Sequence, residues 1–526
     1  MAAKREETAS SVRLADLVAL LSLGTDLGLG QPMEHMIRAT LIALRLAERL
    51  GLDDARREVL YYSGLLAWVG CHTDAYEQAK WLGDDLAIKG EAHYGGDMAK
   101  PGPAAAFMLK NVGGAGRPLV ARARIGAVFL GEGRRALQAL AENHYMATDA
   151  LAERLGLGDE VRKSLGQSYE RWDGKGPQGL RGDAVSMEAR LMNLADVAEA
   201  FRRAGGVEAA VAEARSRSGS QFDPTLVDML ASEATDMFAE IDGAAAWELV
   251  IAAEPTLARR VPADDLDEAL EAIGEFAELK SPWTMGHARR VAQLAAEAGR
   301  GVGLAPPAVE ALRRASLLHD IGNLGVSNSI WDKRGPLSPA ELERVRLHPY
   351  LTERMLSYSP SLAPLGAIAG QHHERLDGSG YPRGLRVDAI SRTGRILAAA
   401  DVHVALTEER PYRAALSEQD ARKVLLAEVS AGRIDGGAAD AVLRAAGHHV
   451  PIRRDWPEGL TTREVQVLRL LALGLSNREI AERLVISTKT AGTHIENIYS
   501  KVGASNRAQA SVFAMRHSLV GDPITA

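Results

Sequence analysis

Seven residues in the second half of the chain have side chains that bind metal ions through nitrogen or oxygen. They are spread over several predicted helices, mostly beside apolar faces: His287, His319, Asp320, His348, His372, His373 and Asp401. The adjacent pair His319 and Asp320 follows the apolar run Leu317-Leu318, so we expect the pair on a buried helix. A buried carboxylate without a partner is costly, and a carboxylate that bridges two cations avoids that cost. The set therefore predicts a metal-binding site.

Any one of these histidines, taken alone, is most simply an ordinary core or surface residue. That explanation does not suit the whole set. Eight of the 14 histidines lie between residues 265 and 450, and five of those eight occupy the positions named above.

The elements that position these residues are predicted to be helices. Apolar residues recur at helical spacing, as in Val291, Leu294, Ala295 and Ala298, and no run alternates convincingly as a strand does. Aromatic residues make up only 5 % of a chain rich in Ala, Leu, Glu and Arg, which favours helices. A length of 526 residues is enough for about three domains. We therefore expect an all-α protein.

An internal repeat divides the chain. The segment from Glu374 to Val402 reads ERLDGSGYPRGLRVDAISRTGRILAAADV, and the segment from Glu170 to Val197 reads ERWDGKGPQGLRGDAVSMEARLMNLADV. Upstream, His35 precedes a helical stretch as His287 does. We expect a first helical domain at residues 1–245, a linker at 246–264, a second copy at 265–450 and a smaller domain at 451–526.

The first copy lacks most of the ligand-type residues. His319 and Asp320 correspond to Ala67 and Trp68, and the pair His372–His373 corresponds to Ser168–Tyr169. His35, His144 and Asp196 remain, and these three without the bridging carboxylate are not expected to hold two metals. We interpret copy one as a degenerate structural or sensory domain; an alternative is that it binds a nucleotide without cutting it.

Copy two resembles the HD superfamily of metal-dependent phosphohydrolases, and specifically its HD-GYP class. The matching motifs are HDIGN from His319, HHERLDGSGYP from His372 to Pro382, AAD ending at Asp401, and RPYR from Arg410 to Arg413. The resemblance covers all of copy two. It implies a helical fold, hydrolysis of a phosphodiester, and cyclic di-GMP as the usual substrate.

The resemblance also implies which residues bind which metal. One ion would be held by His287, His319, Asp320 and Asp401, and the other by Asp320, His348, His372 and His373, with Asp320 bridging. Family sites hold iron or manganese, and these ligands suit both. Some members bind a third metal through a Glu at the position of Trp283, so we expect two divalent metals here.

Further site residues follow from the same resemblance. His319 and Asp320 are the expected catalytic pair, because two cations activate water and neutralise phosphoryl charge. Arg410 and Arg413 match positions that hold substrate phosphates, for which surface salt bridges are the ordinary alternative. Gly380, Tyr381 and Pro382 shape the loop. Asn323 replaces the family's lysine and removes a cation from the phosphate pocket, which weakens the case for fast catalysis.

The C-terminal segment resembles the LuxR-type helix-turn-helix module. Thr461 with Glu464, and Ser476 with Glu479, predict capping boxes at two helix starts, and a third helix is expected over residues 488–502. Residues 460–519 carry eight Lys or Arg against four Glu, although the whole chain has a net charge of −7. This contrast favours DNA binding over a merely solubilising helix face. The resemblance makes this a small four-helix domain whose DNA-contacting residues are Lys489, Thr490, Gly492, Thr493, Glu496 and Lys501.

The remaining sequence features indicate where in the cell the protein is expected to reside. A single cysteine, Cys71, excludes an internal disulfide framework and fits a reducing compartment. The charged N-terminus does not read as a signal peptide, and no long uncharged apolar run occurs. We expect a cytoplasmic homodimer that binds DNA and a cyclic dinucleotide but no membrane.

These features lead to two hypotheses. The first is a signalling protein in which an HD-GYP phosphodiesterase is coupled to a transcriptional regulator. The second is a non-catalytic transcription factor whose HD domain senses a nucleotide or a metal and only regulates DNA binding.

Overall fold

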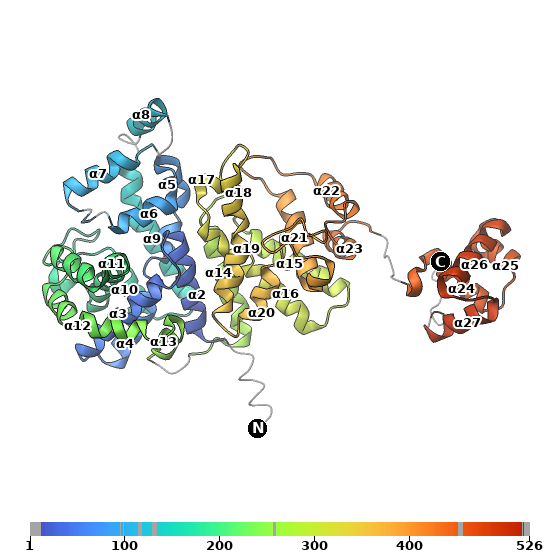
Figure 1. Ribbon diagram of the computed structural model, residues 1–526, viewed down its shortest axis with the longest axis horizontal. Coiled ribbons are helices and arrows are strands. Elements are labelled where there is room, and N and C mark those ends of the chain that lie inside the picture. The colour runs from blue at the N-terminus through green and yellow to red at the C-terminus, as the bar shows by residue number, and fades with distance from the viewer. Residues whose placement is uncertain are drawn as a thin grey trace, which may run out of the picture. The chain divides into compact units, whose positions relative to one another are not determined.

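The computed structural model describes residues 12–94, 96–97, 99–113, 118–128, 134–255, 259–450, 456–517 and 519. The chain forms two compact units, residues 1–448 and 449–526. Within the described ranges both units are built from helices, and extended backbone pairs only at isolated bridges. The first unit contains both repeats, and in Figure 1 the colour of its helices runs from blue to orange along the chain.

Copy one contains the elements α2 to α13. Their bounds are α2 Leu14–Gly28, α3 His35–Arg49, α4 Asp54–Leu66, η1 Val69–His72, α5 Ala75–Leu82, α6 Asp85–Tyr94, α7 Pro101–Asn111, α8 Leu119–Val128, α9 Arg134–Arg154, α10 Asp159–Leu165, η3 Gly182–Ala184, α11 Met187–Ser216, α12 Pro224–Asp242 and α13 Ala246–Ala252.

Copy two runs from α14 to α23. Its bounds are α14 Ala263–Glu278, α15 His287–Gly301, α16 Pro306–Leu318, η4 Ile321–Gly325, α17 Asn328–Trp331, α18 Pro339–Arg346, α19 His348–Ser357, α20 Ala363–Ala369, η5 Val387–Ala389, α21 Arg392–Thr407, α22 Glu418–Ser430 and α23 Gly436–Ala445.

The sequence repeat is also a repeat of local geometry. The helices α3 and α15 both begin after a residue in the left-handed conformation, Glu34 in copy one and Gly286 in copy two. The Gly-rich loops are organised by equivalent buried carboxylates. Glu374 accepts hydrogen bonds from two main-chain N–H groups of its loop, and Glu170 does the same in copy one. A carboxylate buried with two such donors is satisfied, so each loop holds its shape.

The two copies share one apolar core rather than forming separate globules. Helix α2 of copy one packs against η4 of copy two, and α14 of copy two packs against α9 of copy one. His72 Nε2 lies 2.8 Å from the Phe276 carbonyl oxygen, across this interface. Within the segment expected to be a linker, 246–264, helix α13 packs against α2 and α3.

Two acids and two lysines lie along the same interface. Asp85 Oδ1 accepts from the Ser327 hydroxyl and from the Asn328 N–H of copy two. Its other oxygen lies 3.9 Å from both Lys89 Nζ and Lys280 Nζ. Asp84 forms a further ion pair across the boundary, to Arg344.

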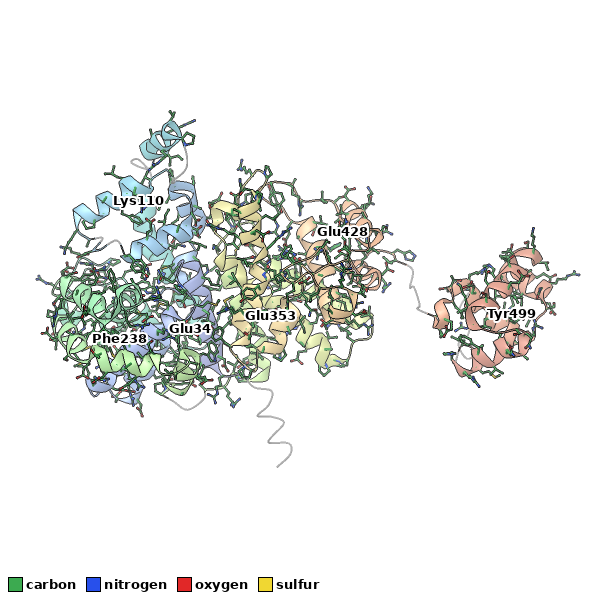
Figure 2. All side chains as sticks on the ribbon, viewed as in Figure 1. Glu34, Lys110, Phe238, Glu353, Glu428 and Tyr499 are labelled. Carbon is green, nitrogen blue, oxygen red and sulfur yellow. The ribbon has the colours of Figure 1, made fainter. Side chains whose placement is uncertain are left out.

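The C-terminal unit is a small helical domain around its own core. Its helices are α24 Thr462–Ala472, α25 Asn477–Leu484, α26 Thr488–Val502 and α27 Arg507–Arg516. Both expected capping boxes are present, at Thr461 with Glu464 and at Ser476 with Glu479. The half-buried ring of Tyr499, labelled in Figure 2, belongs to α26 and packs against this core. No described helix in either unit has both the length and the apolar character needed to cross a bilayer.

Candidate metal centre

The carboxylate of Asp320 is the centre of the side-chain cluster in copy two. One oxygen, Oδ1, lies 3.4 Å from His348 Nε2 and 3.5 Å from His372 Nε2. The other, Oδ2, lies 3.7 Å from His319 Nε2 and 3.9 Å from His287 Nε2. Asp320 therefore presents its two oxygens to two different pairs of imidazoles.

Different elements bring these residues together. His287 begins α15 and His348 begins α19, while His319 is the C-cap of α16 and Asp320 leads into η4. His372 and His373 follow α20, and Asp401 lies inside α21. The structure thus gathers all seven ligand-type residues at one place. Of these, only Asp320 and His373 have side chains more than a fifth exposed.

The orientation of three histidines is set by main-chain carbonyls. The Nδ1 atom of His319 donates to the Ser316 oxygen at 2.7 Å, that of His348 to Val345 at 2.6 Å, and that of His372 to Ala369 at 2.7 Å. A proton held on Nδ1 leaves the Nε2 lone pair free, and Nε2 is the atom that each ring presents to Asp320.

A second carboxylate completes the other half of the cluster. Asp401 Oδ1 lies 3.2 Å from His287 Nε2 and 3.8 Å from His319 Nε2, and Asp401 Oδ2 lies 3.8 Å from His373 Nδ1. The second ring nitrogen of His287 faces Glu408, with 2.9 Å between Nδ1 and Oε2. Glu408 was not among the residues predicted from sequence. The sequence shows Glu408 only as an acid seven residues after Asp401, and in a single sequence that spacing does not distinguish it from other acids.

The two carboxylates stay ionised in this setting. Burial by itself raises the pKa of Asp320, but the His319, His372 and His348 rings hold that pKa well below its usual range. Burial also raises the pKa of Asp401, but the neighbouring rings of His287 and His319 hold that pKa well below its usual range. Burial lowers the pKa of His348 to about 4 and that of His373 well below its usual value, so these rings stay neutral. Against the effect of burial, Asp401 and Glu408 raise the pKa of His287 to about 10, and Asp320 and Asp401 raise the pKa of His319. Anionic carboxylates and neutral imidazoles are the forms that bind metal ions, so these two rings would release a proton when an ion binds.

The donor set fits divalent cations. His319 Nε2 is buried and has no hydrogen-bond partner among the described residues, although it faces both carboxylates. Ligand atoms at about 2.1 Å from a shared ion stand roughly 3–3.5 Å apart, close to the separations seen here. Among the described residues, the groups able to hold an ion include His287 with His319 and Asp401, and His348 with His372 and His373.

The Gly-rich loop places an aromatic ring over the cluster. Tyr381 lies with its ring centroid 4.7 Å from that of His373, and its N–H donates to the His373 carbonyl at 3.1 Å. Gly380 has to be glycine, because a Cβ there would stand 2.3 Å from the Arg375 nitrogen. The loop therefore covers the side of the cluster next to His373.

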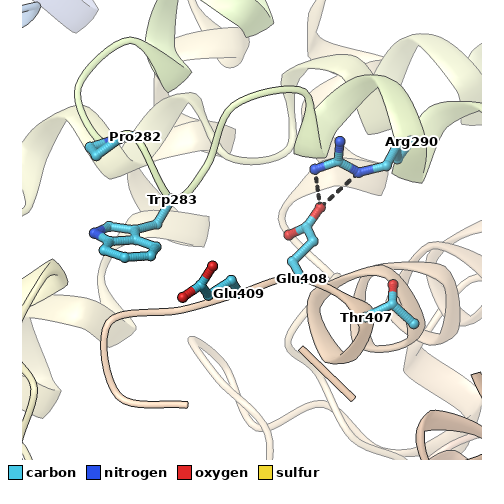
Figure 3. Close-up of a pocket in the computed structure, with 6 residues that line it drawn as sticks. All are labelled: Pro282, Trp283, Arg290, Thr407, Glu408 and Glu409. Carbon is cyan, nitrogen blue, oxygen red and sulfur yellow. Dashed lines mark hydrogen bonds and ion pairs between the residues drawn. The ribbon is translucent and has the colours of Figure 1, made fainter. Parts of the chain in front are cut away.

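The two arginines of the RPYR segment have different surroundings. Arg413 donates to main-chain carbonyls, at 3.0 Å to Leu406 and also to Ala405, so it caps the end of α21 rather than facing the cluster. Arg410 pairs with Glu408 at 2.7 Å and lies 3.5 Å from His287 Nδ1. Figure 3 shows Glu408 reaching Arg290 at the edge of a surface pocket of about 500 Å³ that Trp283 also lines. Of the two arginines, Arg410 is the one beside the cluster.

Asn323 lies in the protein interior rather than on the open face of the metal-ligand cluster. Its side chain is buried, and it lines a cavity of about 20 Å³ together with Asp320, His287 and Lys280. Lys280 was missed by sequence reasoning, although its ammonium lies beneath the turn that follows Asp320. It donates to the Leu324 oxygen at 2.7 Å and to the Val326 oxygen at 2.6 Å. A cation is therefore present near Asn323, but it is engaged by the backbone.

The remaining ligand-type residues of copy one do not form the same cluster. Asp196 accepts from His35 Nε2 at 2.8 Å and lies 3.2 Å from His93 Nε2. His144 lines the same cavity as His93 and Asp196 but is not part of the group that they form with His35, and its Nδ1 lies 3.5 Å from the Cys71 sulfur. His93 lies in an insertion that has no counterpart in copy two, so the repeat could not reveal it. Copy two contains a further group of side chains close enough to hold a metal ion, formed by His403, Glu418 and His448.

The predicted DNA-contacting face is on α26. Ala491, Ile495 and Ile498 are buried in the module core, whereas the predicted contacts Lys489, Thr490, Thr493 and Glu496 are exposed and Gly492 is half-buried. Lys501 is different, because its ammonium donates to Glu464 at 2.8 Å and to the Gly459 oxygen at 3.0 Å. Five of the six predicted residues thus share the outer face, and the sixth ties α26 to α24.

Comparison with known protein families gives two matches. A family model described as an HD domain matches residues 136–226 and 271–437. A model described as bacterial regulatory proteins of the LuxR family matches residues 458–514.

Individual relatives extend the match over both copies. The chain is 33 % identical over 409 residues to 3'3'-cGAMP-specific phosphodiesterase 3 of Vibrio cholerae, covering 77 % of this chain and 88 % of that protein. It is 40 % identical over 152 residues to a cyclic di-GMP phosphodiesterase of Thermotoga maritima, covering 28 % of this chain and 41 % of that protein. The crystal structure of a V. cholerae cyclic GMP-AMP-specific phosphodiesterase has a TM-score of 0.59 and 27 % identity, covering 84 % of this chain and 99 % of that one.

Proposed function

This chain belongs to the HD-domain family and carries a LuxR-family regulatory domain at its C-terminus, and from that premise we propose that it is a metal-dependent phosphodiesterase of 3'3'-linked cyclic dinucleotides that also binds DNA. The observation that carries the proposal is the position of Asp320, whose two oxygens face two separate pairs of imidazoles. A carboxylate in that position is suited to bridge two cations.

The proposal assigns a ligand role to each residue of the cluster. His287, His319, Asp320 and Asp401 would hold one divalent ion, and Asp320, His348, His372 and His373 the other. Iron and manganese both suit these ligands. Bound there, two cations lower the pKa of water and neutralise the charge on phosphoryl oxygens. The buried main-chain acceptors of His319, His348 and His372 keep the three rings in position before any substrate arrives.

Two side chains next to the cluster are suited to the substrate. Tyr381 presents an aromatic ring beside His373, against which a nucleobase can stack. Arg410 presents a guanidinium near His287, and guanidinium groups suit phosphate oxygens. We propose no phosphate role for Arg413, because its guanidinium donates hydrogen bonds to main-chain carbonyls of α21.

The relatives guide the choice of substrate. The relative that spans both copies is named as specific for 3'3'-cGAMP, and the one matching a shorter part is named for cyclic di-GMP. Both compounds are cyclic dinucleotides with two 3'–5' phosphodiester bonds. The proposed reaction opens one of these bonds by the attack of water and leaves a linear dinucleotide.

The C-terminal module supports the second half of the proposal. Lys489, Thr493 and Glu496 form an exposed polar face on α26, behind which the core residues are apolar. A helix of this kind lies in the major groove in helix-turn-helix proteins. We propose that this face reads DNA, that the protein acts as a homodimer in the cytoplasm, and that it regulates transcription.

A second candidate is a sensor that binds the cyclic dinucleotide without cutting it. The observation in its favour is Asn323, which takes the place of the family's lysine and is buried beside a small cavity. The experiment that separates the two is incubation of the Mn²⁺-loaded full-length protein with 3'3'-cGAMP or cyclic di-GMP, followed by chromatography. The phosphodiesterase proposal expects a linear product that disappears in His319→Ala. Stoichiometric binding of the dinucleotide with no product in either protein would establish the sensor instead.

A further inference from the structure

Copy one has kept a large cavity where copy two has its metal cluster. The cavity measures about 920 Å³ and is lined by Trp68, Tyr169, His144 and Lys89, among other residues. Trp68 stands at the position that Asp320 has in copy two. A volume of this size is in the range of sites that enclose nucleotide-sized molecules.

Hydrogen bonding in copy one argues against a metal at this place. Arg203 Nη1 lies 3.3 Å from His35 Nδ1, and because arginine can only donate, that ring nitrogen is the acceptor. The proton of His35 is then on Nε2, where it is donated to Asp196 at 2.8 Å. A protonated Nε2 cannot bind a cation, so the ligand of this cavity is of another kind.

Three polar atoms on the cavity wall are buried without a hydrogen-bond partner among the described residues. They are Trp68 Nε1, His144 Nε2 and Lys89 Nζ. The Lys89 side chain is 9 % exposed, and its nearest acid is Asp85 at 3.9 Å. Burying a donor without an acceptor costs about 1–3 kcal/mol, and more for a charged group. The indole N–H and the ammonium can only donate, so the missing partner is rich in acceptors.

The acids that line the same cavity are already engaged. Asp196 faces His35 and His93, and Glu170 accepts from the main-chain N–H groups of its loop. Asp74 accepts from the Asn143 amide at 2.9 Å. Lys175 is exposed at the rim and pairs with Asp173 at 3.4 Å. The acids of the wall are therefore engaged, and the one carboxylate oxygen near Lys89 Nζ, Asp85 Oδ2 at 3.9 Å, lies outside the wall and is shared with Lys280.

Aromatic rings supply a second kind of contact. Trp68 and Tyr169 lie with ring centroids 5.1 Å apart, and Tyr169 and His144 with centroids 4.9 Å apart. Such rings bind flat aromatic groups. We propose that the cavity of copy one is a non-hydrolytic binding site for a phosphate ester of an aromatic base, a nucleotide or cyclic dinucleotide, with Lys89 on the phosphate and Trp68 and Tyr169 on the base.

The test measures binding in a protein that cannot turn the ligand over. Full-length Asp320→Ala is titrated with cyclic di-GMP by calorimetry, and the titration is repeated with Lys89→Met added. The matched control adds Lys163→Met instead, which removes an exposed lysine of copy one away from the cavity. The proposal expects Lys89→Met to lose one equivalent of binding or at least tenfold in affinity, and Lys163→Met to change neither. Because no hydrolysis is involved, failure here is separate from failure of the proposed catalytic function.

Thermal unfolding of Lys89→Met tests whether loss of the fold, rather than loss of a ligand contact, explains weaker binding. Asp85 keeps Lys280, the Ser327 hydroxyl and the Asn328 N–H as partners when the Lys89 ammonium is removed, so Lys89→Met is expected to change the unfolding temperature little. Lys175→Met, at the exposed rim, provides a second variant and is expected to weaken binding at least threefold. Unchanged affinity and stoichiometry in both Lys89→Met and Lys175→Met would overturn the proposal. So would binding of inorganic phosphate as tight as that of cyclic di-GMP, since the aromatic wall would then contribute nothing.

Discussion

Glu408 and Arg203 lie at equivalent points of the internal repeat and present opposite charges to the same ring nitrogen. Glu408 follows Asp401 by seven residues and lies 2.9 Å from His287 Nδ1. Arg203 follows Asp196 by seven residues and lies 3.3 Å from His35 Nδ1. An acid at this place draws the imidazole proton to Nδ1 and frees Nε2 for a metal, whereas an arginine forces the proton onto Nε2. This exchange separates the protonation of His35 from that of His287, in addition to the loss from copy one of residues equivalent to His319, Asp320, His372 and His373.

Exchanging this partner in copy two tests that relationship. Glu408→Arg is expected to weaken metal binding at the ion held by His287 and Asp401 by about 10–100-fold, the usual effect of losing a partner of a ligating histidine. Metal content after dialysis against a weak chelator measures it. Glu409→Arg is the matched control, because Glu409 is the exposed neighbour on the same pocket rim (Figure 3). Equal metal loss in both variants would show that surface charge alone, and not the His287 contact, is responsible.

The buried ammonium of Lys280 predicts a dependence of stability on pH. Lys280→Met is expected to lower the free energy of unfolding at pH 7 by about 1–3 kcal/mol, because the carbonyls of Leu324 and Val326 lose their donor. Burial lowers the pKa of Lys280 to about 8 from an ordinary value of 10.5. Between these two values the unfolded chain binds more protons than the folded one, so the lysine's contribution to stability rises with pH.

Urea denaturation at several pH values between 7 and 10.5 measures this contribution as the difference between the wild type and Lys280→Met. We expect the difference to increase as the pH rises through 8. Lys423→Met removes an exposed lysine of copy two and is expected to show no such trend. A difference that shrinks with pH would mean that Lys280 gains more from its partners than it loses by burial.

The C-terminal module distinguishes two lysines on the same helix. Lys489→Ala in the full-length protein is expected to weaken binding to all DNA sequences and to reduce the slope of log affinity against log salt by about 0.9, the effect of one lost phosphate contact. Lys501→Ala is expected to lower the stability of the module instead, since its ammonium holds Glu464 and Gly459. Fluorescence anisotropy over a salt series measures both. A larger salt effect for Lys501→Ala than for Lys489→Ala would reverse these roles.

Base readout is predicted to reside about one to two helical turns further along α26, at Thr493 and Glu496. Thr493→Ala and Glu496→Ala are each expected to change which sequence is preferred, by about 1–3 kcal/mol at the affected base pair, with little effect on the salt slope. Selection of binding sites from a random DNA pool, performed in parallel with wild type, measures the preference. Identical selected sequences in all three proteins would place base readout elsewhere.

Much of this organisation could be predicted from residue types and spacing. The all-helical fold was confirmed, as was the presence of an HD domain followed by a LuxR-type module. The caps at Thr461 and Ser476 lie where the sequence placed them, because a capping box depends only on residues three apart. The seven ligand-type residues of copy two lie together, while their roles as ligands stay a prediction.

The features that could not be predicted depend on contacts between distant parts of the chain. The proximity of His93 to Asp196 and that of Asp85 to Lys280 join segments far apart in sequence and leave no periodic trace. The family resemblance suggested a phosphate role for Arg413 and a DNA role for Lys501, yet both cations are engaged within the chain. A motif gives the type of a residue, whereas the partners of its side chain are set by packing.

The central claim is that Asp320 bridges two divalent ions in copy two, and the metal content of one variant tests it most directly. The experiment compares four Mn²⁺-loaded and desalted proteins: wild type, Asp320→Ala, His287→Ala and, as a control at an exposed acid, Asp388→Asn. Atomic emission measures their metal content, and the same samples are assayed with 3'3'-cGAMP and cyclic di-GMP. The account predicts that Asp320→Ala contains two equivalents less than wild type and forms no linear dinucleotide, that His287→Ala contains one less, and that Asp388→Asn matches wild type. An Asp320→Ala protein with the metal content and turnover of wild type would contradict it.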